Sequence, residues 1–369
     1  MEECEYVLWL GTFPGANGKS MQGIAKQVAR RVGEGKCTMD VVDPVLGNGN
    51  VTPAMKGINW VPIRVATNGA FCSGMVRWII EHEAYNKEFV SFTNYKAAVA
   101  GGYASSGNAT HLVIVDETSK NNRKLMGPAD AGMEDPGEKD AKGNAIAQHV
   151  VINAETGELE FDGEVNGVKV KTAFTLMKEA VFEHTIDEYA EICGVPASEI
   201  ERIAKEFTSH GVKASARGLG STVSQVGFDT TMGFRTLNAL VGSMQMIGGT
   251  VSCTAPTSTG DGPRYKLATI KNKPAVSAKN ARYLSRTACA WQKTDEYKNR
   301  VAAGESNPKP KLPWYPISVG SDNQALFSVV NQYPYQAKIV MSWMNNVLQN
   351  TPSGLVDGVI ERMKDTSVV

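Results

Sequence analysis

The chain has 369 residues, a length that predicts two domains or one large α/β unit. Its 38 Lys and Arg residues balance its 38 Asp and Glu residues, so the net charge does not favour a nucleic-acid or anionic-membrane partner. No segment approaches the roughly 20 consecutive apolar residues of a membrane helix, and the six cysteines include no Cys-x-x-Cys pair. We therefore expect no nucleic acid, no direct membrane insertion and no metal ligands in this chain.

The first half of the chain alternates apolar runs with segments of helical periodicity. The elements expected there are strands at 6–10, 38–42, 60–65 and 111–115 and helices at 20–32, 70–82 and 86–93. The amino-acid composition then changes at residues 117–172, which are rich in Asn, Lys, Asp, Gly and Pro. We expect a surface insertion here, with hairpin strands at 150–152 and 158–161 around a turn at 154–157.

The second half resumes the alternation of strands and helices. The elements expected there are helices at 173–183 and 186–192, one starting at Pro196, helices at 227–246 and 353–363, and strands at 213–216 and 337–342. Residues 253–316 are polar and punctuated by proline, which predicts a second, irregular excursion. The order strand, loop, helix, strand at 6–42 is repeated at 338–369.

These patterns predict an α/β fold of two doubly wound, mainly parallel, three-layer (αβα) units of the dinucleotide-binding kind, with a β-hairpin insertion. The first domain is expected at 1–205, with its insertion at about 117–172. The second is expected at 206–369, truncated at both flanks, with its excursion at about 253–316. Because the last residues resemble the start of a buried strand, we expect the chain to be a fragment of a larger polypeptide.

A nucleotide-binding pattern occurs near the N-terminus, in the stretch LWLGTFPGANGKS at residues 8–20. A P-loop has the pattern Gly-x-x-x-x-Gly-Lys-Ser/Thr, because that length lets backbone N–H groups wrap a phosphate. Here the first position of the pattern is Phe13, and Pro14 lacks an N–H donor. The register argues against a triphosphatase. A strand end followed by a glycine-rich turn and a helix N-terminus instead suits the diphosphate of a dinucleotide.

Polar residues follow other predicted strands as well. Asp43 comes after the second strand, where it can accept from ribose hydroxyls or from a base edge, or else open a turn before Pro44. Thr67 and Asn68 lie between a strand and a helix, so they either cap the helix or contact a base. The segment 218–222 is a similar loop after a strand in the second half.

Residues of the usual catalytic kinds form no recognisable constellation. The five histidines occur singly, and the sequence has no nucleophile elbow, His-Glu-x-x-His motif or carboxylate pair at a catalytic spacing. We therefore expect no catalytic residue in this chain.

In their joint order, these segments resemble the molybdopterin oxidoreductase (dimethyl sulfoxide reductase) superfamily, whose large subunits bind two molybdopterin guanine dinucleotides. The family pattern is a strand with a loop near Gly-x-Asn-Pro, a helix, a strand ending in Asp-Pro, and Pro-Gly-Thr-Asp-x-Ala opening a helix. The matching segments are 9–14, 41–44, 65–70, 193–196, 218–220, 237–242, 248–249 and 340–352. They cover most of the chain apart from the two excursions.

The resemblance implies that loop residues hold the phosphates and guanines of the dinucleotides. The cofactor-binding residues that it implies are Gly11, Thr12, Phe13, Asn17, Lys19, Ser20, Asp43, Pro44, Thr67, Asn68, Gly218, Leu219, Gly220, Ser221, Thr222, Trp343, Met344, Asn345 and Asn346. Phe13, Asn68 and Val347 depart from the family pattern. An amide at position 68 can pair with a base but cannot act as a double acceptor, so the contact with guanine would differ.

The resemblance further implies a molybdenum bis(molybdopterin guanine dinucleotide) cofactor in the full-length protein, with a 4Fe–4S cluster and the molybdenum ligand upstream of this chain. Within the superfamily the chain most resembles the tetrathionate reductases, which reduce tetrathionate, a small sulfur oxyanion, to thiosulfate in anaerobic respiration. This implies an iron–sulfur electron-transfer subunit, a membrane-anchor subunit, and twin-arginine export to the periplasm, with the fragment alone inactive. Arsenate and thiosulfate or polysulfide reductases, and a non-catalytic doubly wound nucleotide-binding module, are the alternatives.

Overall fold

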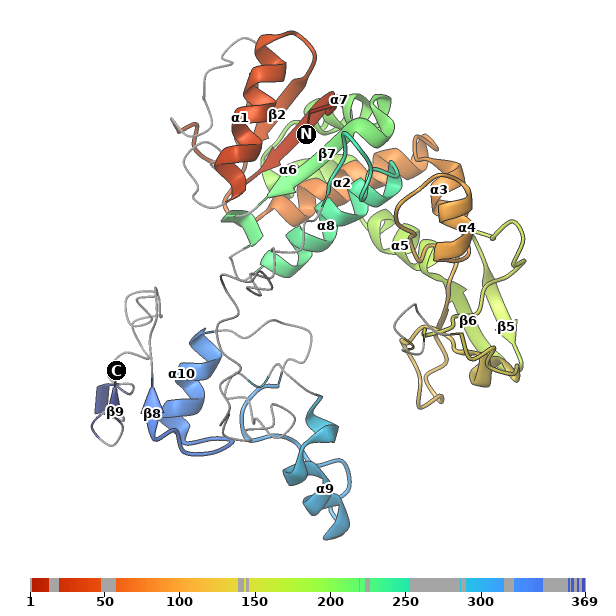
Figure 1. Ribbon diagram of the computed structural model, residues 1–369, viewed down its shortest axis with the longest axis vertical. Helices are drawn as coiled ribbons and strands as arrows, with labels where there is room; N and C mark the ends of the chain where they lie inside the picture. The colour runs from red at the N-terminus through yellow and green to blue at the C-terminus, as the bar shows by residue number, and fades with distance from the viewer. Residues whose placement is uncertain are drawn as a thin grey trace, which may run out of the picture. The chain divides into compact units, whose positions relative to one another are not determined.

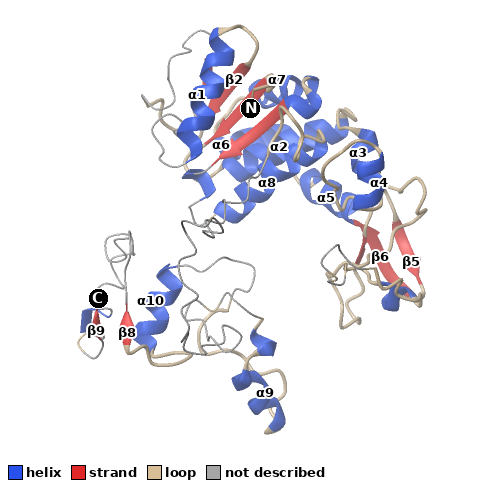
Figure 2. Ribbon diagram, in the orientation of Figure 1, coloured by secondary structure: helices blue, strands red, loops and turns tan. Residues whose placement is uncertain are grey.

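The computed structural model of the chain divides into two compact units, Met1–Pro256 and Thr257–Val369. Figure 1 and Figure 2 show the course of the chain through both. The residues that the structure describes are 2–12, 20–47, 58–138, 143, 146–218, 220–222, 226–251, 286, 290–314, 322–340, 358, 360–361, 364 and 367–368.

The first unit is built on a four-stranded parallel sheet with the strand order β3-β2-β1-β7. Its strands are β1 (Tyr6–Leu10), β2 (Thr38–Val42), β3 (Ile58–Val61) and β7 (Ala214–Gly218). Leu10 is in register with both Val42 and Gly218, and Val42 is in register with Val61. All four strands therefore end at the same edge. The strands predicted at 6–10 and 38–42 are confirmed, and those at 60–65 and 213–216 lie within a few residues of β3 and β7.

Helices cover both faces of this sheet (Figure 2). On one face Val7 and Trp9 pack against Val28 and Val32 of α1 (Ser20–Gly33). On the other face Tyr6, Leu8 and Leu10 share a larger core with α2, α7 and α8. These helices are α2 (Asn68–Glu81), α7 (Ala197–Ser209) and α8 (Gly227–Leu240). Alternate residues of β1 thus face two apolar layers, and for this reason the strand is apolar throughout.

The helices between the insertion and β7 begin and end at residues with clear local signals. α5 (Ala173–Phe182) starts at Thr172, whose side chain accepts a hydrogen bond from the Thr175 N–H. α6 (Ile186–Cys193) has a Thr185–Glu188 capping box and ends at Gly194, which is left-handed with φ +69°. The helices predicted at 173–183, at 186–192 and after Pro196 are confirmed.

The helix predicted at 227–246 is too long, since α8 ends at Leu240. Gly242 adopts φ +70°, and the Ser243 N–H bonds the Asn238 carbonyl, so the chain turns six residues before the expected stop at Gly248. The glycine nearest the end of the periodic segment ends the helix, and the later glycines shape the turn that follows.

The hairpin predicted at 150–161 is wrong in position. The hairpin strands are β5 (Asp162–Val165) and β6 (Val168–Thr172), joined by Asn166 and Gly167. These two residues have φ +52° and +72°, the backbone of a type I′ turn. Antiparallel to β6 lies β4 (Leu112–Ile114), so the strand predicted at 111–115 forms but joins this small sheet instead of the parallel one.

The domain boundary expected at residue 205 stays a prediction, and the first compact unit extends past it to Pro256. β7 pairs with β1 along its whole length, from Ala214 opposite Tyr6 onward. α8 is fastened to this strand by Asn238, whose Oδ1 accepts from the Ala216 N–H at 2.9 Å and whose Nδ2 donates to the Ala216 carbonyl at 2.8 Å. Residues 206–256 therefore complete the first unit.

The second unit contains α9 (Asp295–Ala302), α10 (Asp322–Asn331), β8 (Ile339–Val340) and β9 (Ser367–Val368). β8 and β9 pair in parallel, which agrees with the strand predicted at 337–342 and with the repeated strand order. α9 shows that the predicted excursion at 253–316 is partly helical. Most of the helix predicted at 353–363 lies outside the described residues. That both units are doubly wound remains a prediction.

The remaining elements are short. They are α3 (Lys87–Ser91), which corresponds to the helix predicted at 86–93, α4 (Tyr95–Ala100), and the 3-10 helices η1 (Pro128–Ala131), η2 (Gly211–Lys213), η3 (Gly220–Thr222) and η5 (Trp291–Lys293). None of the helices in the described part of the chain is long and apolar enough to cross a bilayer.

Candidate functional site

The carboxyl edge of the parallel sheet brings together loops that are distant in sequence. Gly11 and Thr12 follow β1, Asp43 follows β2, and the segment 218–222 forms the end of β7 and the loop after it. α1, the next helix after β1, and α8, the next α-helix after β7, pack on opposite faces of the sheet (Figure 1). The strand order reverses between β1 and β7, and open α/β sheets bind ligands in the crevice at such a point.

The loops after β1 and β7 touch through their backbones. The Ser221 N–H donates to the Gly11 carbonyl at 2.8 Å, and the Ser221 hydroxyl donates to the Leu10 carbonyl at 2.8 Å. Gly11 has φ +53°, and a Cβ placed there would lie 2.6 Å from Ser221 Cβ and 2.9 Å from Asn68 Nδ2. A Cβ on Gly220 would lie 2.7 Å from the Gly11 carbonyl oxygen. Only glycine fits these two positions without displacing backbone or a neighbouring side chain.

Two helix N-termini reach the same edge. α2 starts at Asn68 and α8 at Gly227, and a Cβ on Gly69 would lie 3.3 Å from Asp229 Cβ, so their first turns are in contact. Neither helix has a side-chain cap. The Thr67 hydroxyl before α2 donates to the Arg64 carbonyl instead, and Val226 before α8 has no polar side chain. Helix N-termini present backbone N–H groups without intrahelical partners, and these groups favour anions such as phosphates.

Asn68 occupies the centre of this arrangement. The residue is only 4% exposed, and its amide nitrogen lies next to Gly11 in the loop after β1. An Asn at this place suits recognition of a base edge.

Asp43 opens a turn before Pro44, which is one of the two roles that the sequence allows for it. Its carboxylate accepts from the Val45 N–H at 3.1 Å, and its carbonyl accepts from Trp60 Nε1 at 2.9 Å. Burial raises the pKa of the carboxyl, an effect that hydrogen bonds from the Val45 and Thr12 backbones partly oppose. These contacts tie the loop after β2 to the loop after β1, and a role in binding nucleotide remains a prediction.

The structure thus gathers seven of the predicted site residues at one edge of the first unit. They are Gly11, Thr12, Asp43, Asn68, Gly218, Gly220 and Ser221. Thr67 and Thr222 adjoin them, Pro44 follows Asp43, and Ser20 starts α1. The predicted residues that lie outside the described part are Phe13, Asn17, Lys19, Leu219, Trp343, Met344, Asn345 and Asn346.

Two features of this edge were not expected from the sequence. Ala66 adopts φ +66°, a strained left-handed conformation for a residue with a Cβ, two residues before Asn68. Asp229 places a carboxylate in the first turn of α8, beside the start of α2. The sequence contains a signal for the position of Asp229, since a helix is expected to start after the strand at 213–216. Nothing in the sequence marks Ala66 as left-handed.

Titratable residues of the described part do not form a metal centre. No group of three His, Cys, Asp or Glu side chains there is arranged to hold an ion. His210 bonds Glu5 and Glu206 at the amino edge of the sheet, and His111 packs against His149 in the region of the insertion. These three histidines thus lie away from the carboxyl edge.

Comparison with known proteins identifies relatives along nearly the whole chain, although no protein-family model matches it. The tetrathionate reductase A subunit of Salmonella typhimurium is 30% identical over 370 residues, which are 99% of this chain and 36% of the relative. The selenate reductase A subunit of Mesobacillus selenatarsenatis is 30% identical over 91% of this chain and 31% of the relative. The tetrathionate reductase A subunit of Archaeoglobus fulgidus is 28% identical over 96% and 30%.

A solved structure shares the fold. Acetylene hydratase from Pelobacter acetylenicus matches 99% of this chain and 38% of its own length, with a TM-score of 0.52 and 16% identity. The chain spans about a third of the length of the relatives it matches. Its homologues along nearly the whole chain are the A subunits of tetrathionate and selenate reductases, molybdopterin enzymes of the dimethyl sulfoxide reductase family.

Proposed function

We propose that this chain is the molybdopterin guanine dinucleotide-binding core of a molybdenum oxidoreductase catalytic subunit. The observation that carries the proposal is the close packing of the glycine-containing loops after β1 and β7 at the carboxyl edge, where the strand order reverses. Small loops and uncapped helix N-termini suit a dinucleotide, whose diphosphate must approach backbone N–H groups closely. We expect the chain by itself to be inactive.

The residues of this edge divide into those that shape the loops and those that orient the dinucleotide. Gly11 and Gly220 let the loops after β1 and β7 pack closely against each other. The first turns of α2 and α8 direct N–H groups toward the phosphates. Asn68 would hold a base through its amide. The molybdenum–pterin group supplies the redox chemistry when bound, and this part of the protein fixes its position.

We further propose that the parent catalytic chain reduces tetrathionate to thiosulfate. Support comes from two tetrathionate reductase A subunits, each aligned with at least 96% of this chain. Selenate is the second candidate substrate, because the selenate reductase relative is equally identical. The parent complex would include a membrane anchor and an iron–sulfur electron-transfer subunit, carry a 4Fe–4S cluster outside this stretch, and work in the periplasm.

The test uses the full-length subunit that contains this chain, made in a host that synthesises the cofactor. Purified protein should contain molybdenum and release GMP on hydrolysis. The rates at which it reduces tetrathionate and selenate, with a viologen as electron donor, rank the two substrates. Absence of both molybdenum and GMP from well-folded protein would falsify the proposal.

A matched pair of variants locates the site. Gly220→Val pushes the loop after β7 away from the Gly11 carbonyl and should abolish loading with molybdenum and GMP. Gly23→Ala on α1 has no neighbour within 4 Å and should load fully. Full loading of folded Gly220→Val would show that the packing of these loops is not needed for cofactor binding.

A further inference from the structure

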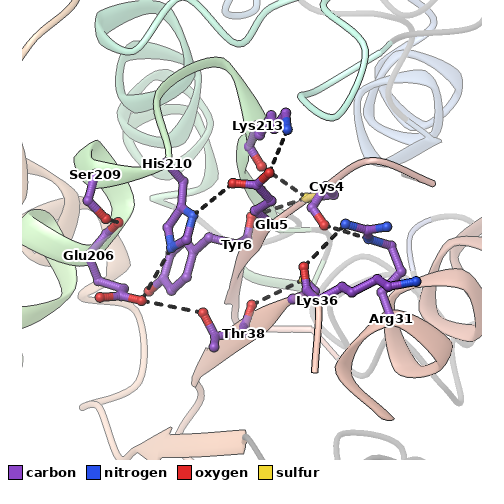
Figure 3. Close-up of polar contacts among 11 residues, drawn as sticks. Cys4, Glu5, Tyr6, Arg31, Lys36, Thr38, Glu206, Ser209, His210 and Lys213 are labelled. Carbon is purple, nitrogen blue, oxygen red and sulfur yellow. Dashed lines mark hydrogen bonds and ion pairs between the residues drawn. The ribbon is translucent and has the colours of Figure 1, made fainter. Parts of the chain in front are cut away.

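Two cysteines lie just before adjacent strands at the amino edge of the sheet. Cys4 precedes β1 and Cys37 precedes β2. Their side chains are 0% and 4% exposed and belong to the same apolar cluster, packed against Val28 and Val32 of α1. Figure 3 shows the surroundings of Cys4, with the Arg31 Nε donating to the Cys4 carbonyl at 2.7 Å. This edge lies at the opposite end of the strands from the candidate dinucleotide site.

The register of the strands places the two cysteines at a distance that suits a disulfide. Tyr6 pairs with Thr38, and the Thr38 N–H donates to the Glu5 carbonyl at 2.9 Å, so the ladder continues toward the cysteines. Cys4 and Cys37 are therefore offset by one residue. With strands about 4.8 Å apart and a rise of about 3.3 Å per residue, their Cα atoms are about 6 Å apart. Disulfides span Cα separations of roughly 4.4–6.8 Å.

The two thiols influence each other's titration. A hydrogen bond from the Cys37 thiol lowers the pKa of Cys4 and raises that of Cys37, and Arg217 favours the Cys4 thiolate further. The Cys4 sulfur also lies 3.2 Å from the Tyr6 carbonyl and 3.3 Å from the Lys213 carbonyl, which fixes its position. Cys4 is thus the thiol prepared to attack, and Cys37 is its neighbour.

We propose that Cys4 and Cys37 form a disulfide bond when the chain folds in an oxidising environment. A small disulfide such as oxidised glutathione accepts the two electrons. The Cys4 thiolate attacks one of its sulfurs and releases one glutathione, and the Cys37 thiolate then displaces the second. One S–S bond breaks and one forms, and the protons of the two cysteines end on the two released thiols. Formation during folding, before the cluster closes, accounts for a bond between two buried sulfurs.

The bond would close the β1–α1–β2 unit at its amino edge. The segment between the cysteines includes α1 and the loop after β1, so cross-linking restricts this segment in the unfolded chain and stabilises the scaffold of the candidate site. The inference does not depend on the proposed cofactor or substrate. It requires only that the chain folds in an oxidising environment, as exported proteins do.

The test refolds the full chain from urea in a buffer of reduced and oxidised glutathione, followed by alkylation and tryptic digestion without reductant. We expect mass spectrometry to find residues 1–19 linked to residues 37–56 in most of the protein. The melting temperature should be about 5–10 °C higher than after reduction with dithiothreitol.

The variants separate this bond from other thiol chemistry. Cys37→Ser should lose both the linked peptide and the reductant-dependent shift in melting temperature. Cys72→Ser is the matched control, because Cys72 is equally buried but belongs to the core on the other face of the sheet, and it should retain both. Natively folded wild-type protein in which Cys4 and Cys37 are both alkylated after oxidative refolding would overturn the proposal. The wild-type peptide map alone decides it if a variant fails to fold.

Discussion

The two edges of the parallel sheet in the first unit are built in different ways. At the carboxyl edge, Gly11 meets Ser221 through the backbone, and two uncapped helices start there. At the amino edge, side chains cross-link the elements (Figure 3): Lys213 Nζ lies 2.5 Å from Glu5 Oε1, and His210 lies 3.4 Å from Glu5 and 3.3 Å from Glu206.

The difference follows from the direction of the helices. In a parallel α/β unit the helices start at the carboxyl ends of the strands, so their N–H groups are presented there, and they end at the amino edge. His210 is the C-cap of α7, so it lies at the amino edge, where that helix ends. We infer that the carboxyl edge serves a ligand and the amino edge serves stability.

The largest effect should come from adding a methyl group at Gly11. Gly11→Ala combines a left-handed φ of +53° with a Cβ 2.6 Å from Ser221 Cβ, and should lower the free energy of unfolding by about 3 kcal/mol. Gly35→Ala shares the left-handed φ, at +70°, but meets nothing within 4 Å, and should cost about 1 kcal/mol. Urea denaturation measures both. Equal losses would mean that the close approach of the loops is unimportant.

The next effect separates ligand binding from stability. Asn68→Ala removes the amide that lies beside Gly11, so in the full-length protein it should lower cofactor retention about tenfold or more while changing stability little. Asn59→Ala removes the 2.8 Å hydrogen bond to the buried Asp40 and should cost about 1 kcal/mol of stability with normal retention. Retention is measured as GMP per molybdenum after gel filtration. The reverse pattern would assign Asn68 to the scaffold.

A smaller effect distinguishes the two edges by the sign of their pH dependence. The hydrogen bond from Lys213 lowers the pKa of Glu5, so this residue stabilises the fold above its unfolded pKa, about 4.3, and less as the pH falls. Burial raises the pKa of Asp43, so the Asp43 carboxyl destabilises the fold increasingly as the pH rises through its folded pKa.

Denaturation from about pH 3 to pH 7 tests this difference through Glu5→Gln and Asp43→Asn. Relative to wild type, Glu5→Gln should lose stability as the pH rises, and Asp43→Asn should gain it. Slopes of the same sign for both variants would contradict the assignment of Asp43 as a buried carboxyl.

The smallest effect is expected from Lys213→Met at the amino edge. The Lys213 side chain is 43% exposed, and exposed ion pairs contribute little because water screens them and the side chains lose freedom. Loading with cofactor should equal that of wild type. A loss of loading would show that the amino edge influences the carboxyl edge after all.

Local patterns predicted most helices and strands of the first unit correctly. β1 and β2 were located by their apolar runs, and α6 by its helical periodicity. The hairpin was misplaced although its signal was present, because Asn166-Gly167 is the usual pair for a type I′ turn and Val165 and Val168 flank it. The end of α8 was misplaced because several glycines follow it and the first of them, Gly242, already adopts the terminating conformation.

Contacts between distant segments decided the rest. The sequence by itself determined the βαβ start of the chain, the glycines and polar residues that follow its strands, and its resemblance to the molybdopterin oxidoreductases. Only the tertiary structure decided that β7 pairs with β1, that β4 joins a separate sheet, and that Gly11, Asn68 and Ser221 meet. The physical reason is that periodicity and capping act within a few residues, whereas strand order depends on which faces can be buried together across the whole unit.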